Sequence, residues 1–139
     1  MLQRIQSVWL LFASICAFLT LKLSFYSGNK LDATNAKVFS GLTATTSTLL
    51  LILTIAVAVA SFVVIFLYKD RKRQLLLTIG VLVLSIIDIS LFFSQTNKFV
   101  EGQYDITAFL PFVIPVLLLL ALRGIWKDEQ MVKKADRLR

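Results

Sequence analysis

Residues 49–93 decide the fold. They read LLLILTIAVAVASFVVIFLY (residues 49–68), KDRKRQ (residues 69–74) and LLLTIGVLVLSIIDISLFF (residues 75–93). A helix of about 20 mostly apolar residues crosses the hydrocarbon core of a bilayer, because each residue rises by about 1.5 Å. Neither apolar run shows the strict alternation of apolar and polar residues that β-barrel strands require. The stretch therefore predicts two transmembrane helices joined by a short basic loop.

Two more apolar runs lie outside this stretch, at residues 5–23 and at about 106–125. The first has the basic start of a secretory signal, but it is longer than a usual signal core and no small-x-small cleavage pattern follows it. Cys16 follows Ile15, whereas lipoprotein processing requires a small residue before the cysteine. We therefore expect a retained helix. The predicted fold class is an all-α membrane protein with four transmembrane helices, in a single integral-membrane domain covering residues 1–139.

The composition argues against most soluble and enzymatic classes. Of the 139 residues, 58% are hydrophobic and 17% are charged, whereas a soluble domain carries roughly 45–50% and about 25%. The chain has no His and one Cys, which excludes a disulfide framework, a zinc site built from His and Cys, and acid–base catalysis by His. The sequence shows no nucleophile–base pair either. We therefore expect no enzymatic activity, no cofactor and no metal.

Basic residues indicate how the helices are oriented. Most of the 15 Lys and Arg residues lie at Arg4, in residues 69–73 and in residues 123–139. Short cytoplasmic loops are rich in Lys and Arg, so both termini are predicted to be cytoplasmic. The same charge is attracted to anionic lipid headgroups, and we expect the lipid bilayer as a partner. No DNA contact is expected, and an RNA or ribosome contact is the weakest alternative.

One acidic residue, Asp88, falls inside a predicted helix, where its insertion costs about 2.5–3.5 kcal/mol at the bilayer centre. At 1.5 Å per residue, Asp88 lies roughly 21 Å from the cytoplasmic edge and Lys22 lies roughly 25 Å from it. Both side chains reach the outer interface at similar depth, so an intramembrane ion pair between them is one interpretation. The alternatives are that Asp88 reaches interfacial water, or that it forms a proton or cation site.

Small residues predict how the first two helices pack. Ala13 and Ala17 are four residues apart, and so are Ala56 and Ala60. This spacing lets neighbouring helix backbones approach closely in lipid. Contact within the bundle is the first interpretation, and a contact face for another protein is the second.

Prolines predict that the fourth helix starts late or bends. Pro111 and Pro115 lie near its outer end, and proline lacks the N–H that a helix interior requires. The two outer connections, residues 24–48 and 94–105, are interpreted as polar loops without a metal or catalytic site.

The C-terminal segment, residues 126–139, is predicted to form a short amphipathic helix. It contains no proline, and Glu129 precedes Lys133 by four residues, which is the favourable order for a helical pair. Trp126 has the position of an interfacial anchor. This helix is expected to lie on or project from the inner surface, where it docks on lipid or on a protein partner.

Six short segments carry a resemblance to a known family, and they are MLQRIQ (1–6), LYKDRKRQ (67–74), LP (110–111), LRGI (122–125), KDE (127–129) and ADRLR (135–139). Together they cover the chain from end to end. The sequence resembles a family of small four-helix bacterial inner-membrane proteins that is catalogued as a domain of unknown function. The resemblance implies a multi-pass protein of the bacterial cytoplasmic (inner) membrane, and it implies no particular activity.

Most of these segments fall on the side that the charges assign to the cytoplasm. Charged residues there are predicted to form a mixed-sign platform, in which acids of the tail clamp Arg4 and Arg71; its members are Arg4, Lys69, Arg71, Arg123, Asp128, Glu129, Asp136 and Arg137. Anionic lipid attracts only positive charge, so a mixed-sign platform favours a membrane-protein partner. The expected function is a non-enzymatic accessory or structural subunit of a larger bacterial inner-membrane complex. The alternative is a small proton- or cation-linked transporter or channel that uses Asp88.

Overall fold

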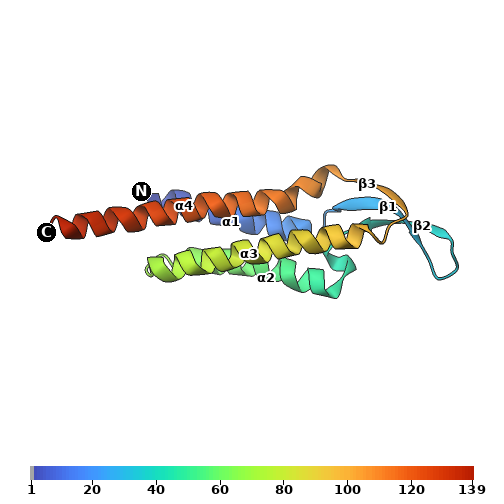
Figure 1. Cartoon of the computed structure of the whole chain (residues 1–139), viewed down its shortest axis with the longest axis horizontal. Coiled ribbons are helices and arrows are strands. Elements are labelled where there is room, and N and C mark those ends of the chain that lie inside the picture. The colour runs from blue at the N-terminus through green and yellow to red at the C-terminus, as the bar shows by residue number, and fades with distance from the viewer. Residues whose placement is uncertain (1) are drawn as a thin grey trace.

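Four helices lie side by side along the long axis of the molecule in the part of the chain that the computed structural model describes (Figure 1). The described residues are 2–139, with side chains from Ile5 onward. The helices are α1 (Leu2–Thr20), α2 (Thr48–Phe66), α3 (Arg71–Thr96) and α4 (Phe109–Arg137). α1 packs against α2 and α4, and α3 packs against the same two helices, so the four form a closed ring. The start of α1 and the end of α4 lie away from the small sheet that caps the other end (Figure 1).

The helices overlap the apolar runs, but their boundaries differ from those expected, and the ends of α1 and α4 matter most for the site. α1 ends at Thr20, whereas the first apolar run continues to residue 23. α4 continues without a break to Arg137, so the predicted C-terminal helix is the end of α4 and projects from the bundle. No Pro or Gly occurs in residues 125–137, and nothing local ends the helix at the point where its composition becomes polar.

The prolines delay the start of α4, as expected. A 3₁₀ turn, η2 (Ile106–Ala108), precedes the helix, which begins at Phe109. Pro111 is the third residue of α4, a position at which the backbone N–H has no helical partner in any case. Pro115 lies inside the helix and removes one hydrogen bond from its first turns.

Small side chains form the contact between α1 and α2. Ala13, Ala17 and Ala58 are fully buried, and Ser14 Oγ donates a hydrogen bond of 3.0 Å to the carbonyl oxygen of Ala58. This close approach is the packing within the bundle that the alanine spacing predicts. Two other small residues of α2 are only half-buried, namely Ala56 and Ala60.

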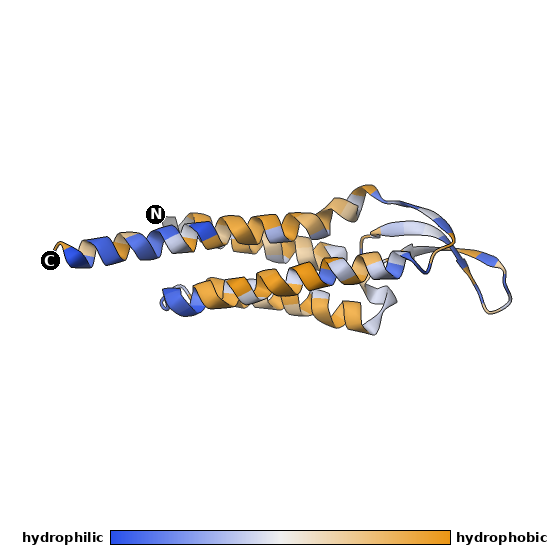
Figure 2. Cartoon of the chain, viewed as in Figure 1, coloured by the Kyte–Doolittle hydropathy of each residue, from blue (hydrophilic) through white to orange (hydrophobic). Residues whose placement is uncertain are grey.

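Large apolar side chains are exposed on the outside of the bundle, and the helices consist mainly of hydrophobic residues along their middle (Figure 2). The exposed fractions are 62% for Ile52, 66% for Phe66 and 70% for Leu76. A soluble protein rarely exposes so large an apolar surface, whereas a bundle in lipid can pack small and polar residues inside and apolar residues outside. By length and composition, α2, α3 and Ile106–Arg137 can each cross a membrane, and the described part of α1 (Ile5–Thr20) is a shorter apolar helix.

The outer connections were expected to be loops, but the structure folds them into a three-stranded antiparallel sheet. The central strand β1 (Tyr26–Leu31) lies between β2 (Lys37–Leu42) and β3 (Glu101–Tyr104). Gly28 faces Gly102 across β1 and β3, and a Cβ on Gly28 would lie 2.2 Å from the carbonyl oxygen of Glu101. Glycine is therefore required for this close approach of two backbones.

An aromatic cluster fixes the sheet to the end of the bundle. Phe25 precedes β1, and its ring centroid lies 4.9 Å from that of Phe92 in α3. The ring of Tyr104 in β3 meets Phe25 edge-on at 5.7 Å. Phe25 and Phe92 are almost completely buried, so this contact forms a second core beside the one inside the bundle.

Candidate functional site

A polar cluster joins the four helices at the end of the bundle opposite the sheet. Gln6 Nε2 of α1 donates a hydrogen bond of 2.9 Å to Asp128 Oδ2 of α4. Arg71 Nη1, at the start of α3, donates to the backbone carbonyl oxygen of Asp128 at 3.3 Å. Gln74 Nε2, also in α3, donates at 3.3 Å to the carbonyl oxygen of Val64 near the end of α2. We call Gln6, Arg71, Gln74 and Asp128 the polar clamp.

The polar clamp is mostly buried. Gln6, Gln74 and Asp128 are 4%, 3% and 8% exposed. A buried polar group that loses its hydrogen-bond partner costs about 1–3 kcal/mol, and a charged group costs more. Gln6 and Asp128 therefore depend on each other, and the bonds made by Arg71 and Gln74 tie α3 to α4 and to α2 at the same end of the bundle.

Gly124 makes room for the polar clamp. It lies one helical turn before Asp128 in α4, and a Cβ added to it would lie 2.8 Å from Cγ of Gln6. Residues four apart share a helix face, so Gly124 and Asp128 both face α1. The absence of a side chain lets the Gln6 amide reach the carboxylate.

Beyond the polar clamp, α4 continues past the ends of the other helices (Figure 1). This extension, residues 129–137, is hydrophilic, whereas the middle of α4 is apolar (Figure 2). Asp128 is bound by α1 through its side chain and by α3 through its backbone. The extension therefore leaves the bundle in a defined direction.

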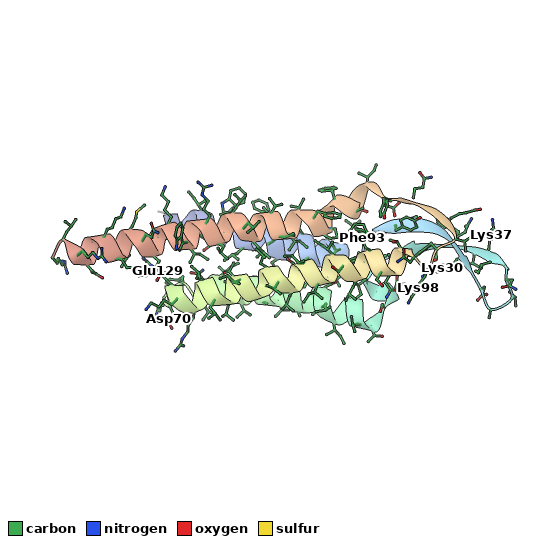
Figure 3. The ribbon with its side chains drawn as sticks, in the orientation of Figure 1. Lys30, Lys37, Asp70, Phe93, Lys98 and Glu129 are labelled. Carbon is green, nitrogen blue, oxygen red and sulfur yellow. The ribbon has the colours of Figure 1, made fainter. Side chains whose placement is uncertain are left out.

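A basic cleft of about 700 Å³ lies between this extension and the loop that joins α2 to α3. Asp70 of the loop and Glu129 of α4 lie at this end of the molecule, on either side of the space between the two elements (Figure 3). The residues that line the cleft are Lys69, Asp70, Arg71, Lys72, Arg73, Glu129, Val132 and Lys133. Five of the eight are basic and two are acidic, so the cleft carries excess positive charge.

The two acids of the basic cleft form ion pairs within their own segments. Asp70 Oδ2 lies 3.6 Å from Arg73 Nη1, and Glu129 Oε1 lies 2.9 Å from Lys133 Nζ. Exposed pairs of this type contribute about 0–1 kcal/mol each. Among the described side chains they leave Lys69, Lys72 and Arg71 without an acidic partner at this distance.

The structure brings together only part of the predicted platform. Asp128 and Arg71 meet in the polar clamp, and Lys69 and Glu129 line the basic cleft beside it. The predicted clamp of Arg71 by carboxylates of the tail is wrong, because the Arg71 guanidinium binds a backbone carbonyl oxygen and the Asp128 carboxylate binds the Gln6 amide. Three members are exposed on α4 outside the polar clamp and the basic cleft, namely Arg123, Asp136 and Arg137. The side chain of Arg4 lies outside the described residues.

The predicted ion pair between Lys22 and Asp88 is wrong. Asp88 is 3% exposed inside the bundle, where Thr54 Oγ1 of α2 lies 3.1 and 3.2 Å from its two carboxyl oxygens. Lys22 is exposed, and no ion pair joins it to Asp88 in the described part of the chain. The reason is that α1 ends at Thr20, so Lys22 lies in the following turn rather than on a helix face.

The Thr54 hydroxyl has one proton and lies near two possible acceptors, the Asp88 carboxyl group and a backbone carbonyl oxygen. Thr54 Oγ1 also lies 2.8 Å from the carbonyl oxygen of Leu50, which is its shortest contact. A hydroxyl has one proton to donate. With that proton on Leu50, Asp88 binds Thr54 only if the carboxyl itself carries a proton. The contact joins α3 to α2 in either of two ways: Thr54 donates its proton to the Asp88 carboxylate, or it donates to Leu50 and a protonated Asp88 donates to Thr54.

Sequence reasoning missed the amides and the hydroxyl that complete these contacts. Gln6 and Gln74 are polar residues at the basic ends of two apolar runs, and Thr54 is the only threonine in a third run. Their positions within otherwise apolar helices are the signal that marks them, since buried polar groups need partners. The partner of each depends on how the helices pack.

Comparison with known proteins gives one match. The model of a protein family, a domain of unknown function (DUF4293), matches residues 2–138. This confirms the resemblance to a family of unknown function. No curated protein and no solved structure matches the chain. Among the described side chains, no three His, Cys, Asp or Glu residues are grouped in a way that could hold a metal ion.

Proposed function

The chain belongs to the family of a domain of unknown function (DUF4293), and from this premise we propose that it is a non-enzymatic accessory or structural subunit of a larger complex in the bacterial inner membrane. In this proposal four helices span the bilayer and both termini are cytoplasmic. The protein offers its partner a rigid charged surface, made of the polar clamp, the basic cleft and the extension of α4.

Two observations support the membrane location and the orientation. The outside of the bundle is apolar, while its interior holds alanines and hydroxyl groups, which suits lipid rather than water. The end with the basic cleft carries most of the excess positive charge, and such ends face the cytoplasm. The sheet then lies on the outer side of the membrane.

The single observation that carries the subunit role is the hydrogen bond between Gln6 and Asp128. Anchoring to lipid requires only positive charge and no fixed direction for α4. A buried amide–carboxylate bond instead sets the position of the extension relative to α1. Rigid placement of mixed charges is what recognition of a protein partner needs, because it sets orientation and suppresses wrong partners.

The test is mass spectrometry of the natively expressed full chain, extracted in mild detergent with a small tag after Arg139. We expect a reproducible set of stoichiometric membrane partners. Asp128→Ala is expected to deplete that set, because it releases the extension of α4. Asp32→Ala, the same exchange at an exposed position beside the sheet at the opposite end of the molecule, serves as the control and is expected to retain the partners.

Recovery of the protein alone, or only as a homo-oligomer, contradicts the subunit role. Equal partner recovery with Asp128→Ala and Asp32→Ala contradicts the importance of the fixed extension. Both variants are first compared with the original protein by membrane abundance and by gel filtration, so that loss of folding is recognised as such.

Asp88 favours a second candidate, a small proton- or cation-linked transporter. A carboxyl that is 3% exposed and has Thr54 as its hydrogen-bond partner is an unusual group inside an apolar bundle. Reconstitution in vesicles with an imposed proton or cation gradient tests it. Flux that is lost in Asp88→Asn and kept in Asp136→Asn supports transport, and the absence of flux with the unaltered protein excludes it.

A further inference from the structure

We propose that the basic cleft binds the phosphodiester headgroup of an anionic glycerophospholipid, one lipid per chain. This inference rests on the membrane location proposed above and not on the accessory-subunit role. It assigns a defined site to a lipid, which is more than a general attraction of basic loops to the membrane surface.

The basic side chains of the cleft outnumber its acids, and this excess of positive charge favours binding of an anion. Of its five basic side chains, two are matched by neighbouring acids in the Asp70–Arg73 and Glu129–Lys133 pairs. Lys69, Lys72 and Arg71 are left to face a shared volume of about 700 Å³. A phosphodiester group supplies the missing negative charge and accepts several hydrogen bonds.

Arg71 is the oriented member of the site. Its Nη1 atom is held at 3.3 Å by the backbone carbonyl oxygen of Asp128, a neutral acceptor, so the guanidinium keeps its full charge. A guanidinium has five N–H donors in a planar fork, and this fork matches phosphate oxygens in pairs. The Arg71 side chain is only partly exposed, so it loses less conformational entropy when a ligand binds than a fully exposed side chain would.

The position of the cleft favours a lipid over a soluble phosphate. The cleft begins directly after α2, whose last residue Phe66 is apolar and 66% exposed. Tyr68 follows and is also half-exposed, at the depth where interfacial aromatic residues lie. The cleft is thus at headgroup level, and Val132 adds an apolar contact on the side of α4. Basic pockets at the cytoplasmic ends of helices bind anionic headgroups in this way.

The site is composite, and this makes it testable. Lys72 belongs to α3 and Lys133 to α4, yet both line the same cleft. Lys127 and Lys134 lie on α4 close to Lys133 but do not line it. Replacing Lys72 and Lys133 removes two positive charges from this end of the protein, and replacing Lys127 and Lys134 removes two as well. General surface attraction therefore predicts equal effects, whereas a defined site predicts unequal effects.

The experiment is native mass spectrometry of the purified full chain in detergent, titrated with phosphatidylglycerol and, separately, with phosphatidylcholine. We expect one phosphatidylglycerol to bind in preference to phosphatidylcholine. Lys72→Gln/Lys133→Gln is expected to weaken that binding by about 30-fold, at about fivefold for each lysine. Lys127→Gln/Lys134→Gln is expected to bind like the unaltered protein. The single variant Lys72→Gln, expected to lose about fivefold, keeps the test valid if the cleft double variant folds poorly.

Equal weakening in the two double variants, or no preference for phosphatidylglycerol, overturns the proposal. A titration with inorganic phosphate distinguishes a lipid headgroup from a soluble anion, since both present phosphate oxygens to the cleft. Phosphate that binds alone and displaces the lipid would make the cleft a site for a soluble anion, and phosphate in excess that leaves the lipid bound supports a headgroup site. Because the purified protein is used, this result does not depend on whether partner proteins are captured from membranes.

Discussion

Gln6 and Asp128 are 122 residues apart in the chain, and a hydrogen bond of 2.9 Å joins the amide of one to the carboxylate of the other. The bond closes the ring of helices between α1 and α4. In α4 it lies directly before the extension begins. It therefore determines where the bundle ends and where the exposed charged surface starts.

This bond predicts a non-additive double-mutant cycle. Gln6→Leu leaves a buried carboxylate without its partner and is expected to lower the free energy of unfolding by about 1–3 kcal/mol, and Asp128→Leu by a similar amount. The double variant Gln6→Leu/Asp128→Leu is expected to lose less than either single change, because two apolar side chains satisfy each other. Unfolding in detergent measures all three, with the exposed Gln130→Leu as control. Losses that simply add would show that the two residues are not coupled.

Replacing Gly124 by alanine is expected to lower the stability of the protein, whereas the same exchange at Gly80 is not. Gly124→Ala places a Cβ 2.8 Å from Cγ of Gln6 and is expected to destabilise the protein by about 1–3 kcal/mol through overpacking. Gly80→Ala is the matched control, because no atom lies within 4 Å of its added Cβ. That change is expected to be neutral or to stabilise α3 by up to about 1 kcal/mol. Thermal unfolding of the two variants side by side is the measurement, and equal melting temperatures would contradict the close approach of α1 to α4.

Asp88 predicts that an amide can replace the carboxyl. If the carboxyl is neutral and donates to Thr54, then Asp88→Asn keeps a donor in place and is expected to leave the free energy of unfolding almost unchanged. Asp88→Leu and Thr54→Val remove the interhelical hydrogen bond and are expected to cost about 0.6–2 kcal/mol each. Stability measurements in detergent compare the three. A loss in Asp88→Asn as large as that in Asp88→Leu would mean that the protein requires the ionised carboxylate.

The proposed orientation predicts which ends of the protein react with a membrane-impermeant thiol reagent. In a Cys16→Ser background, Lys30→Cys in the sheet is expected to be labelled on intact cells. Lys134→Cys in the extension of α4 is expected to be labelled only after the inner membrane is opened. Lys30, Lys37 and Lys98 all gather at the sheet end, so Lys98→Cys gives an independent reading of the same side (Figure 3). The reverse pattern would invert the assignment of the cytoplasmic face.

Much of the helical part was predictable because its causes are local. Residues 49–68 and 75–93 are apolar enough and long enough that only helices satisfy their backbone groups in lipid. The late start of α4 also follows from Pro111 and Pro115 alone. A helix after residue 125 was also predicted, from the absence of proline in the C-terminal segment, and the structure shows it as a direct continuation of α4.

The sheet and the site were not predictable, because their causes are not local. β1 and β3 are polar and are separated along the chain by two long helices, so neither strand shows a pattern of its own. Their pairing becomes favourable only when the bundle brings residues 26–31 and 101–104 together and Phe25 packs on Phe92. For the same reason the sequence marked Asp88 as costly but assigned it the wrong partner.

The sequence by itself determined where the helices lie, which end is basic and which polar residues are costly to bury, because hydropathy, proline and charge act residue by residue. Only the tertiary structure decided that Gln6 binds Asp128, that Thr54 binds Asp88 and that Lys72 and Lys133 share one cleft. Each of these relationships joins residues on different helices. Hydrogen bonds and charge pairs act over a few ångströms, and those distances exist only after the helices have packed.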